Sequence, residues 1–337
     1  MPSRRIVKIF TAHRQREGAG FIVTRPFPSA NLKDADTDPF LMLDALGPTM
    51  VDHRSPGAPW HPHRGFDTVT YFKRGAGAHQ DSMGNKGVVK EGEVQWMRAG
   101  SGVIHDEGNP GLTRDDPPRP SQGFQLWVNL PARLKMSPPD YQQLTAETFV
   151  WRDYVAHGSQ GTRVKVIAGD LSDGSDGVRS PLNDALSVPV MYVDVDMKPG
   201  ANAVIPIPAG YETALVFVYA GSVRVFNGDK DAAGSPANRA DCIVYASDDG
   251  ALRLATPAAD EYAPSEPVPE TPTTDDLERE AREYHGASLL VLAGQRIGEP
   301  VARHGPFVMN TDEELRQAFA DYHSGKLATV KAQETKH

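Results

Sequence analysis

Cysteine is almost absent from this chain, since Cys242 is the only one among 337 residues. A single cysteine excludes an intramolecular disulfide and favours a reducing compartment. We therefore expect a cytoplasmic protein in which Cys242 is packed in the interior.

Long apolar runs are missing as well. The longest lie around residues 214–220 and 287–293, well short of the ~20 residues that a membrane helix needs. The basic N-terminal stretch holds one apolar run, at 6–10, which is too broken for a secretory signal. We expect no association with a membrane.

Positive charge is in deficit, because the formal net charge is −9. Clustered lysines and arginines carry phosphate binding, so this balance argues against a direct nucleic-acid surface. Residues 257–284 contain nine acidic residues, two arginines and five prolines. This composition predicts a solvated acidic insertion with a short exposed helix over 275–283.

Short apolar runs separated by turn residues make up most of the chain, which has 31 glycines and 28 prolines. This pattern is typical of β sandwiches and barrels, and the length exceeds that of a single core. The sequence predicts a mostly β protein with two tandem barrels, at 1–150 and 151–310. The predicted strands are 6–10, 21–24, 40–43, 68–72, 94–97 and 124–128, then a second series from residue 164 that includes 189–195, 203–207, 214–219, 223–226, 243–245 and 289–292.

The end of the chain, 311–337, has the signals of a helix and a tail. Thr311 is a candidate N-cap, and Leu315, Phe319 and Tyr322 follow at helical spacing. We expect Gly325 to end this helix.

Two pairs of polar residues repeat the same two-residue spacing. On a strand, His61 and His63 point to one face, and so do His105 and Glu107 about forty residues later. If the two segments are neighbouring strands, three imidazoles and one carboxylate converge as a metal site. Without thiolate ligands, this set favours iron or manganese with open positions, and imidazole also suits nickel, copper and zinc. Iron(II) leads.

The sequence around these residues resembles the two cupin motifs, at 57–75 and 92–109, and resembles the pirin family within the cupins. Four blocks carry the resemblance, in the family's order and over nearly the whole chain: HPHRGFDTVTYFKRGAGAHQDSMGN, GEVQWMRAGSGVIHDE, GFQLWVNLP and GPFVMNTDEELRQAFADYHSGKL.

This resemblance implies a bicupin whose N-terminal cupin holds one metal through His61, His63, His105 and Glu107. It also implies a C-terminal cupin without metal, and the segment that matches the first histidine pair, 206–210, reads PIPAG and has no histidine.

The resemblance further implies quercetin 2,3-dioxygenase activity, in which O2 opens the central ring of a flavonol and carbon monoxide is released. Glu107 is then both a ligand and the candidate base for the flavonol hydroxyl. A second hypothesis is a non-catalytic, redox-sensing co-regulator that binds a transcription factor or a metabolic enzyme, in the nucleus as well if the source is eukaryotic. A third is a cupin with an unrelated substrate. A monomer is the default expectation.

Other residues near the motifs have weaker claims. Asp67 is expected to orient His63 by a hydrogen bond rather than to bind the metal. His53 and His79 break the two-residue register and are expected on the surface or in loops. The candidates for the mouth of a substrate pocket are Asp44, Arg64 and Gln125. The residues expected in the barrel core are Trp96, Met97, Phe124 and Trp127, and we expect one or two of them to line a pocket for a flat ligand.

Overall fold

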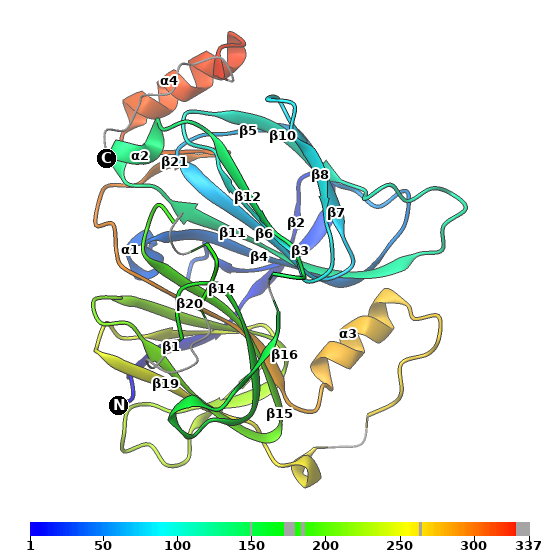
Figure 1. Cartoon of the computed structure of the whole chain (residues 1–337), viewed down its shortest axis with the longest axis vertical. Helices are drawn as coiled ribbons and strands as arrows, with labels where there is room; N and C mark the ends of the chain where they lie inside the picture. The colour runs from blue at the N-terminus through cyan, green and yellow to red at the C-terminus, as the bar shows by residue number, and fades with distance from the viewer. Residues whose placement is uncertain (149, 172–178, 183–185, 263–264, 328–337) are drawn as a thin grey trace. The chain divides into compact units, whose positions relative to one another are not determined.

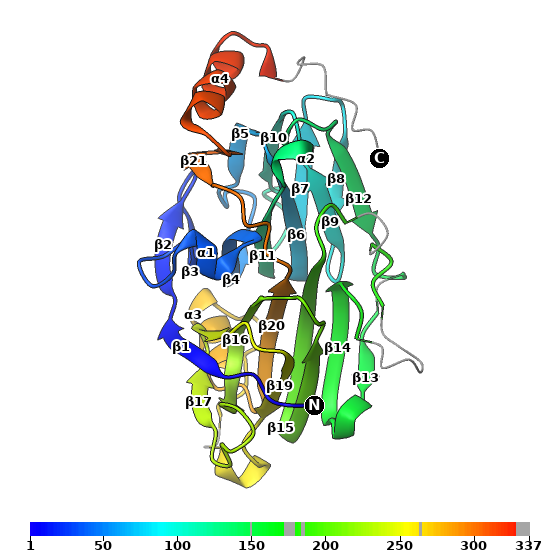
Figure 2. The ribbon, with the colours of Figure 1, turned by 90° about the vertical axis from the view of Figure 1, so that its left-hand side faces the viewer.

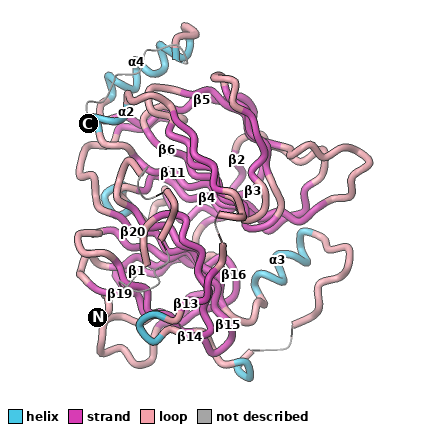
Figure 3. Tube along the Cα trace, viewed as in Figure 1, coloured by secondary structure: helices cyan, strands magenta, loops and turns pink. Residues whose placement is uncertain are grey.

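The structure is a computed structural model that describes residues 1–148, 150–171, 179–182, 186–262 and 265–327. Strands dominate this part of the chain (Figure 3), and the expected mostly β class with a short C-terminal helix is confirmed. In these residues, no helix has both the length and the apolar character required to cross a bilayer.

Two compact units divide the chain, and neither is one continuous stretch of sequence (Figure 1). Unit 1 consists of Met1–His13, Ser29–Thr37 and Glu147–Arg296. Unit 2 consists of Arg14–Pro28, Asp38–Ala146 and Ile297–His337. The first strand of the chain therefore belongs with its second half, and the last helix belongs with its first half.

Unit 2 contains a seven-stranded sheet in the order β12-β9-β6-β11-β4-β3-β2, a four-stranded sheet in the order β5-β10-β7-β8, and the small pair β21-β22. Its elements are β2 (His13–Glu17), β3 (Phe21–Phe27), β4 (Phe40–Val51), β5 (Ala58–His63), β6 (Phe66–Arg74), β7 (Gly77–Asp81), β8 (Lys86–Val89), β9 (Val94–Arg98), β10 (Val103–Gly108), β11 (Arg119–Asn129), α2 (Ala132–Lys135), β12 (Asp140–Leu144), β21 (Ala302–His304), β22 (Phe307–Met309) and α4 (Asp312–His323).

Unit 1 is built on one nine-stranded antiparallel sheet in which β1 pairs with β18, far along the chain. Its elements are β1 (Ile6–Thr11), α1 (Asp34–Thr37), β13 (Arg152–Tyr154), β14 (Gln160–Ala168), β15 (Val190–Ile207), β16 (Thr213–Val225), β17 (Ser235–Asn238), β18 (Asp241–Tyr245), β19 (Gly250–Ala255), α3 (Thr274–Arg282) and β20 (Ala287–Gly294), with single 3-10 turns at Ala156–Gly158 and Ala259–Glu261. Its core is an apolar cluster that includes Val193, Ile205 and Val216, and the described members of that cluster include no histidine.

The predicted strands are present, but two pairs of them are single long strands. Segments 189–195 and 203–207 both belong to β15, and 214–219 and 223–226 both belong to β16. The first two segments are predicted from the sequence as separate strands. Instead, β15 bends at Gly200, where φ is +69°, and changes partner from β14 and β20 to β19.

Both predicted helices form, and a threonine is the N-cap of each, Thr273 for α3 and Thr311 for α4. Thr311 caps α4, its side chain accepting a hydrogen bond from the Glu314 amide, and Gly325 follows the helix in the left-handed region. The helix expected in the acidic insertion is α3, although it buries Leu277 and is therefore not fully exposed. Cys242 is fully buried, as expected.

The apolar core of unit 1 predicts a stability effect that is separate from the chemistry of unit 2. Ile205→Ala removes a side chain with no exposed surface and is expected to lower the free energy of unfolding by about 2–5 kcal/mol, because it leaves a cavity. Urea titration measures the change. Val155→Ala, at a side chain that is 74% exposed, is the control with a change below about 0.5 kcal/mol. A loss at Ile205 as small as the control would contradict the packing described.

Candidate metal centre

Strands β5 and β10 are neighbours in the four-stranded sheet (Figure 1), as the metal-site prediction requires. His105 is the cross-strand partner of His61, and Val103 is that of His63. The register shifts between His105 and Glu107, so Glu107 pairs with Ala58. Paired residues of antiparallel strands share a face, so His61 and His105 point into one space.

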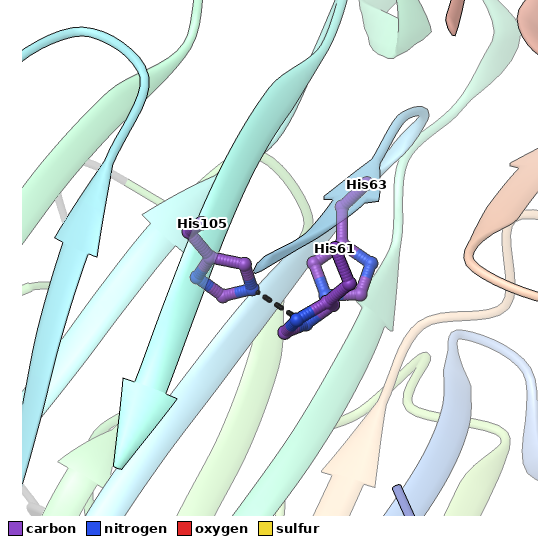
Figure 4. Close-up of side chains that lie close together, drawn as sticks. All are labelled: His61, His63 and His105. Atoms are coloured by element: carbon purple, nitrogen blue, oxygen red, sulfur yellow. Dashed lines mark hydrogen bonds between the residues drawn. The ribbon is translucent and has the colours of Figure 1, made fainter. Parts of the chain in front are cut away.

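Three imidazoles meet at this space, and their ligand atoms lie within 4.8 Å of one another (Figure 4). Nε2 of His61 is 3.0 Å from Nε2 of His63 and 2.9 Å from Nε2 of His105. His63 and His105 are buried, and His61 is partly exposed. The structure therefore brings together the three predicted histidines.

The second ring nitrogen shows how two of these histidines are protonated. Nδ1 of His61 lies 2.8 Å from the Pro59 carbonyl oxygen, and Nδ1 of His63 lies 3.3 Å from that of Pro306. A carbonyl oxygen can only accept, so both imidazoles carry their proton on Nδ1 and present a lone pair at Nε2. Two lone pairs 3.0 Å apart repel each other unless a cation lies between them. The donor set thus fits a metal ion.

Burial favours the neutral form of two of these histidines. The pKa of His63 lies well below its usual value because of burial first and the neighbouring His105 and His61 second. Burial, followed by the charge of His61, lowers the pKa of His105 to about 3. Neutral imidazole is the form that binds metals, so a metal does not compete with protons at neutral pH at these two residues.

Glu107 follows on the same strand, and its carboxylate is held from the opposite sheet. The Thr70 hydroxyl of β6 lies 3.4 Å from Glu107 Oε1 and 2.7 Å from Gln125 Oε1 of β11. Burial raises the pKa of the Glu107 carboxyl above its usual range. The contact shows that the two sheets of unit 2 face each other across the site.

Thr70 is a site residue that the sequence analysis missed. A threonine inside a predicted strand gives no signal of its own, but the register places Thr70 beside Gln125. The hydroxyl has one hydrogen and cannot donate to both neighbours at once. If the Gln125 amide nitrogen faces Thr70, Gln125 donates to Thr70 and Thr70 donates to Glu107.

The three residues expected at the pocket mouth lie in different surroundings. Gln125 joins the Thr70 contact. Asp44, its cross-strand partner on β4, accepts two hydrogen bonds of 2.6 Å from Arg25. Arg64 is buried, and its guanidinium donates to the Ser101 carbonyl and to Asp321.

Two expectations about nearby residues are wrong. Asp67 does not take the orienting role, because it accepts a hydrogen bond of 2.9 Å from the Trp96 indole and alternation along β6 points it away from Thr70. The Pro306 carbonyl contacts His63 Nδ1 instead. His79 is not in a loop or on the surface: it lies on β7 with 8% of its surface exposed, opposite Glu107, where a contact between distant segments places it.

Aromatic residues form one wall of the site, and His53 lies outside it. The Trp127 ring lies 5.2 Å from the His63 ring and 4.3 Å from that of Phe66. Met97 and Phe124 are core residues, with 1% and 0% exposure. His53 lies in a turn, as expected. Trp127 is thus the predicted aromatic residue that meets the histidine cluster.

Comparisons with known proteins agree with this architecture. A family model described as Pirin matches residues 20–128, and one described as Pirin C-terminal cupin domain matches residues 269–328. A pirin-like protein of Caulobacter vibrioides is 37% identical over 330 residues, which cover 97% of this chain and 100% of that protein.

Solved structures extend the likeness to the fold. The crystal structure of a quercetin 2,3-dioxygenase from Acinetobacter baumannii is 29% identical, has a TM-score of 0.77, and is matched over 98% of this chain and 100% of that one. The bacterial pirin YhhW from Escherichia coli, crystallised in complex with nickel(II), shares the fold at 19% identity and a TM-score of 0.51 over 88% of this chain and 100% of that one. The expected bicupin fold is confirmed.

The buried histidines predict how the metal-free protein responds to acid. The folded-state pKa of His105 is lowered from 6.5 to about 3, so the folded form rejects a proton that the unfolded form binds. Stability is therefore complete above about pH 6.5 and falls as the pH drops toward 3, by about 2 kcal/mol at pH 5 from His105. Calorimetry of chelator-treated protein at pH 7 and pH 5 measures this loss. His105→Asn is expected to lose less stability between these two pH values than the unsubstituted chain, and equal losses would refute the assignment.

Proposed function

This chain belongs to the pirin family, and from that premise we propose that its N-terminal cupin holds one divalent metal ion and opens a flavonol ring with O2, as a quercetin 2,3-dioxygenase. The observation that carries the proposal is that Nε2 of His61 lies within 3.0 Å of Nε2 of both His63 and His105, with Nδ1 of His61 and His63 directed at carbonyl oxygens. His61, His63, His105 and Glu107 are the proposed ligands.

Iron(II) is the metal that we propose, with manganese, nickel, copper and zinc as alternatives to be tested. Three imidazoles and one carboxylate without sulfur suit an ion with open positions. The nickel(II) complex of the Escherichia coli pirin supports a metal site in this fold. Elemental analysis of anaerobically purified protein decides which ion is bound.

The residues around the proposed ion have different roles. A bound divalent ion supplies Lewis acidity, which lowers the pKa of a substrate hydroxyl. The carbonyl oxygens of Pro59 and Pro306 hold two imidazoles in the orientation that keeps their lone pairs directed inward. Trp127, which is partly buried and packs against the buried Phe66, offers a flat apolar ring beside His63 for a polycyclic aromatic substrate.

Glu107 is the proposed base for the flavonol hydroxyl proton. Burial raises the pKa of its carboxyl, so the carboxylate accepts a proton more readily than an exposed glutamate does. The Thr70 hydroxyl holds Oε1 in place, and Gln125 orients Thr70. Proton transfer to Glu107 weakens the hydrogen bond from Thr70, which favours return of the proton at a later step.

We also propose a cytoplasmic location, and a nuclear one as well if the source is eukaryotic. Cys242 is the only cysteine and is fully buried, which suits a reducing compartment. The alternative is a redox-sensing co-regulator that binds a transcription factor or a metabolic enzyme. It requires the same metal site but no catalytic turnover.

Oxygen uptake tests the proposed reaction. We expect the native chain to consume O2 with quercetin in proportion to its bound metal, because substrate activation depends on that ion. A His61→Ala, His63→Ala double variant is expected to lose both the metal and the uptake. Stoichiometric metal with no O2 uptake for any flavonol would reject the dioxygenase and favour a redox-sensing binding protein.

Thr70→Val tests the role of the hydroxyl beside Glu107. Losing a hydrogen bond to a carboxylate, worth about 1.5–3 kcal/mol, is expected to lower kcat/KM about 10-fold or more and to shift its pH profile, without loss of metal. Thr70→Ser keeps the hydroxyl and is the matched control with near-native kinetics. An unchanged pH profile in the valine variant would show that Thr70 does not act through Glu107.

A further inference from the structure

The chain's C-terminal arm, defined here as residues 297–327, belongs to unit 2 together with the metal ligands. It consists of β21, β22 and α4, and it lies at the end of unit 2 that carries β5 (Figure 2). More than 200 residues separate it in sequence from the histidine pair. Yet it contacts each of the three consecutive residues His63, Arg64 and Gly65.

Backbone groups of the arm contact residues 63–65, which are called the ligand loop here. The Pro306 carbonyl oxygen lies 3.3 Å from Nδ1 of His63, and the Val308 amide donates to the Arg64 carbonyl over 3.1 Å. At Gly65, where φ is +90°, a Cβ atom would clash with the Val308 carbonyl oxygen. Only a glycine lets the arm approach this closely.

A buried ion pair adds a side-chain link. Nη1 of Arg64 donates to Oδ2 of Asp321 on α4 over 2.8 Å, with the Arg64 and Asp321 side chains only 2% and 12% exposed. Nε of Arg64 donates to the Ser101 carbonyl over 2.7 Å, in the turn that leads into β10 and His105. Gln317, one turn earlier on α4, donates to the other Asp321 oxygen. Arg64 thus ties both ligand segments to α4.

Lys135 closes the same junction from α2. Lys135 is 1% exposed, and its ammonium group donates to the carbonyl oxygens of Gly65 and Val308 at 2.8 and 3.1 Å and to Asn129 Oδ1 at 2.7 Å. The three N–H groups are all used, so one buried cation bridges the ligand loop and the arm. Such a junction tolerates little displacement, because moving the arm takes the Asp321 carboxylate from Arg64 and the Val308 carbonyl from Lys135, and both cations are buried.

We propose that Asp321, acting through Arg64, and the Pro306 carbonyl are positioning groups of the metal centre, so that metal binding and arm docking stabilise each other. This inference rests on the proposed metal site but not on the dioxygenase reaction. The arm fixes the ring of His63 and, through Ser101, the segment that leads to His105. By linkage, a metal that requires this arrangement strengthens the docking of the arm.

Metal titration of Asp321→Asn tests the coupling. With Fe(II) under anaerobic conditions and with Co(II), we expect about 10-fold weaker binding and an altered visible spectrum of the Co(II) form, because the ligand geometry relaxes. Glu313→Gln is the matched control: it removes the same charge from α4, but Glu313 is exposed and bonds to Arg316. Affinity and spectrum equal to the native chain in a folded Asp321→Asn would overturn the proposal.

Hydrogen exchange of the native chain tests the reciprocal effect and needs no variant. Loading with Fe(II) is expected to slow exchange at the Val308 amide and along the C-terminal half of α4. Exchange that is the same with and without metal would overturn the coupling. A native chain that binds neither ion would instead reject the proposed metal site, which separates the two failures.

Discussion

Two imidazole lone pairs 3.0 Å apart repel each other, and this constraint governs the structure around His61 and His63. The carbonyl oxygens of Pro59 and Pro306 hold both rings so that the lone pairs face inward, and the buried position of His63 keeps it neutral. Without a metal ion, neither the facing lone pairs nor the burial of the His63 imidazole stabilises the folded protein. Both are consistent with a cation whose binding free energy offsets the local cost.

Groups from distant parts of unit 2 hold the ligands in this unfavourable arrangement. One sheet supplies the ligands, the facing sheet supplies Thr70 to hold Glu107, and the C-terminal arm supplies Asp321 and the Pro306 carbonyl. Thr70 and Asp321 are each held by a second hydrogen bond, with Gln125 and with Gln317 respectively. This is the pattern of a site whose ligands are oriented before the metal arrives.

The two units use similar architecture for different purposes. The interior of unit 2 carries histidines, a carboxylate and hydroxyl and amide groups around one space. The interior of unit 1 is an apolar cluster around residues such as Val193 and Ile205. Hydrophobic burial therefore dominates in unit 1, whereas unit 2 retains buried polar groups whose desolvation requires hydrogen bonds and a proposed ion.

The sequence by itself determined the predicted strand segments, the C-terminal helix and the two polar pairs that each share one face of a strand, because alternation, capping residues and two-residue spacing are local properties. That β5 and β10 pair, so that His105 joins His61 and His63, was decided by the tertiary structure. Only the tertiary structure decided that β15 continues through Gly200, that His79 is buried opposite Glu107, and that Thr70 rather than Asp67 meets the site. It also placed the arm against His63. These features depend on which distant strands pair and in which register, and no local pattern encodes that choice.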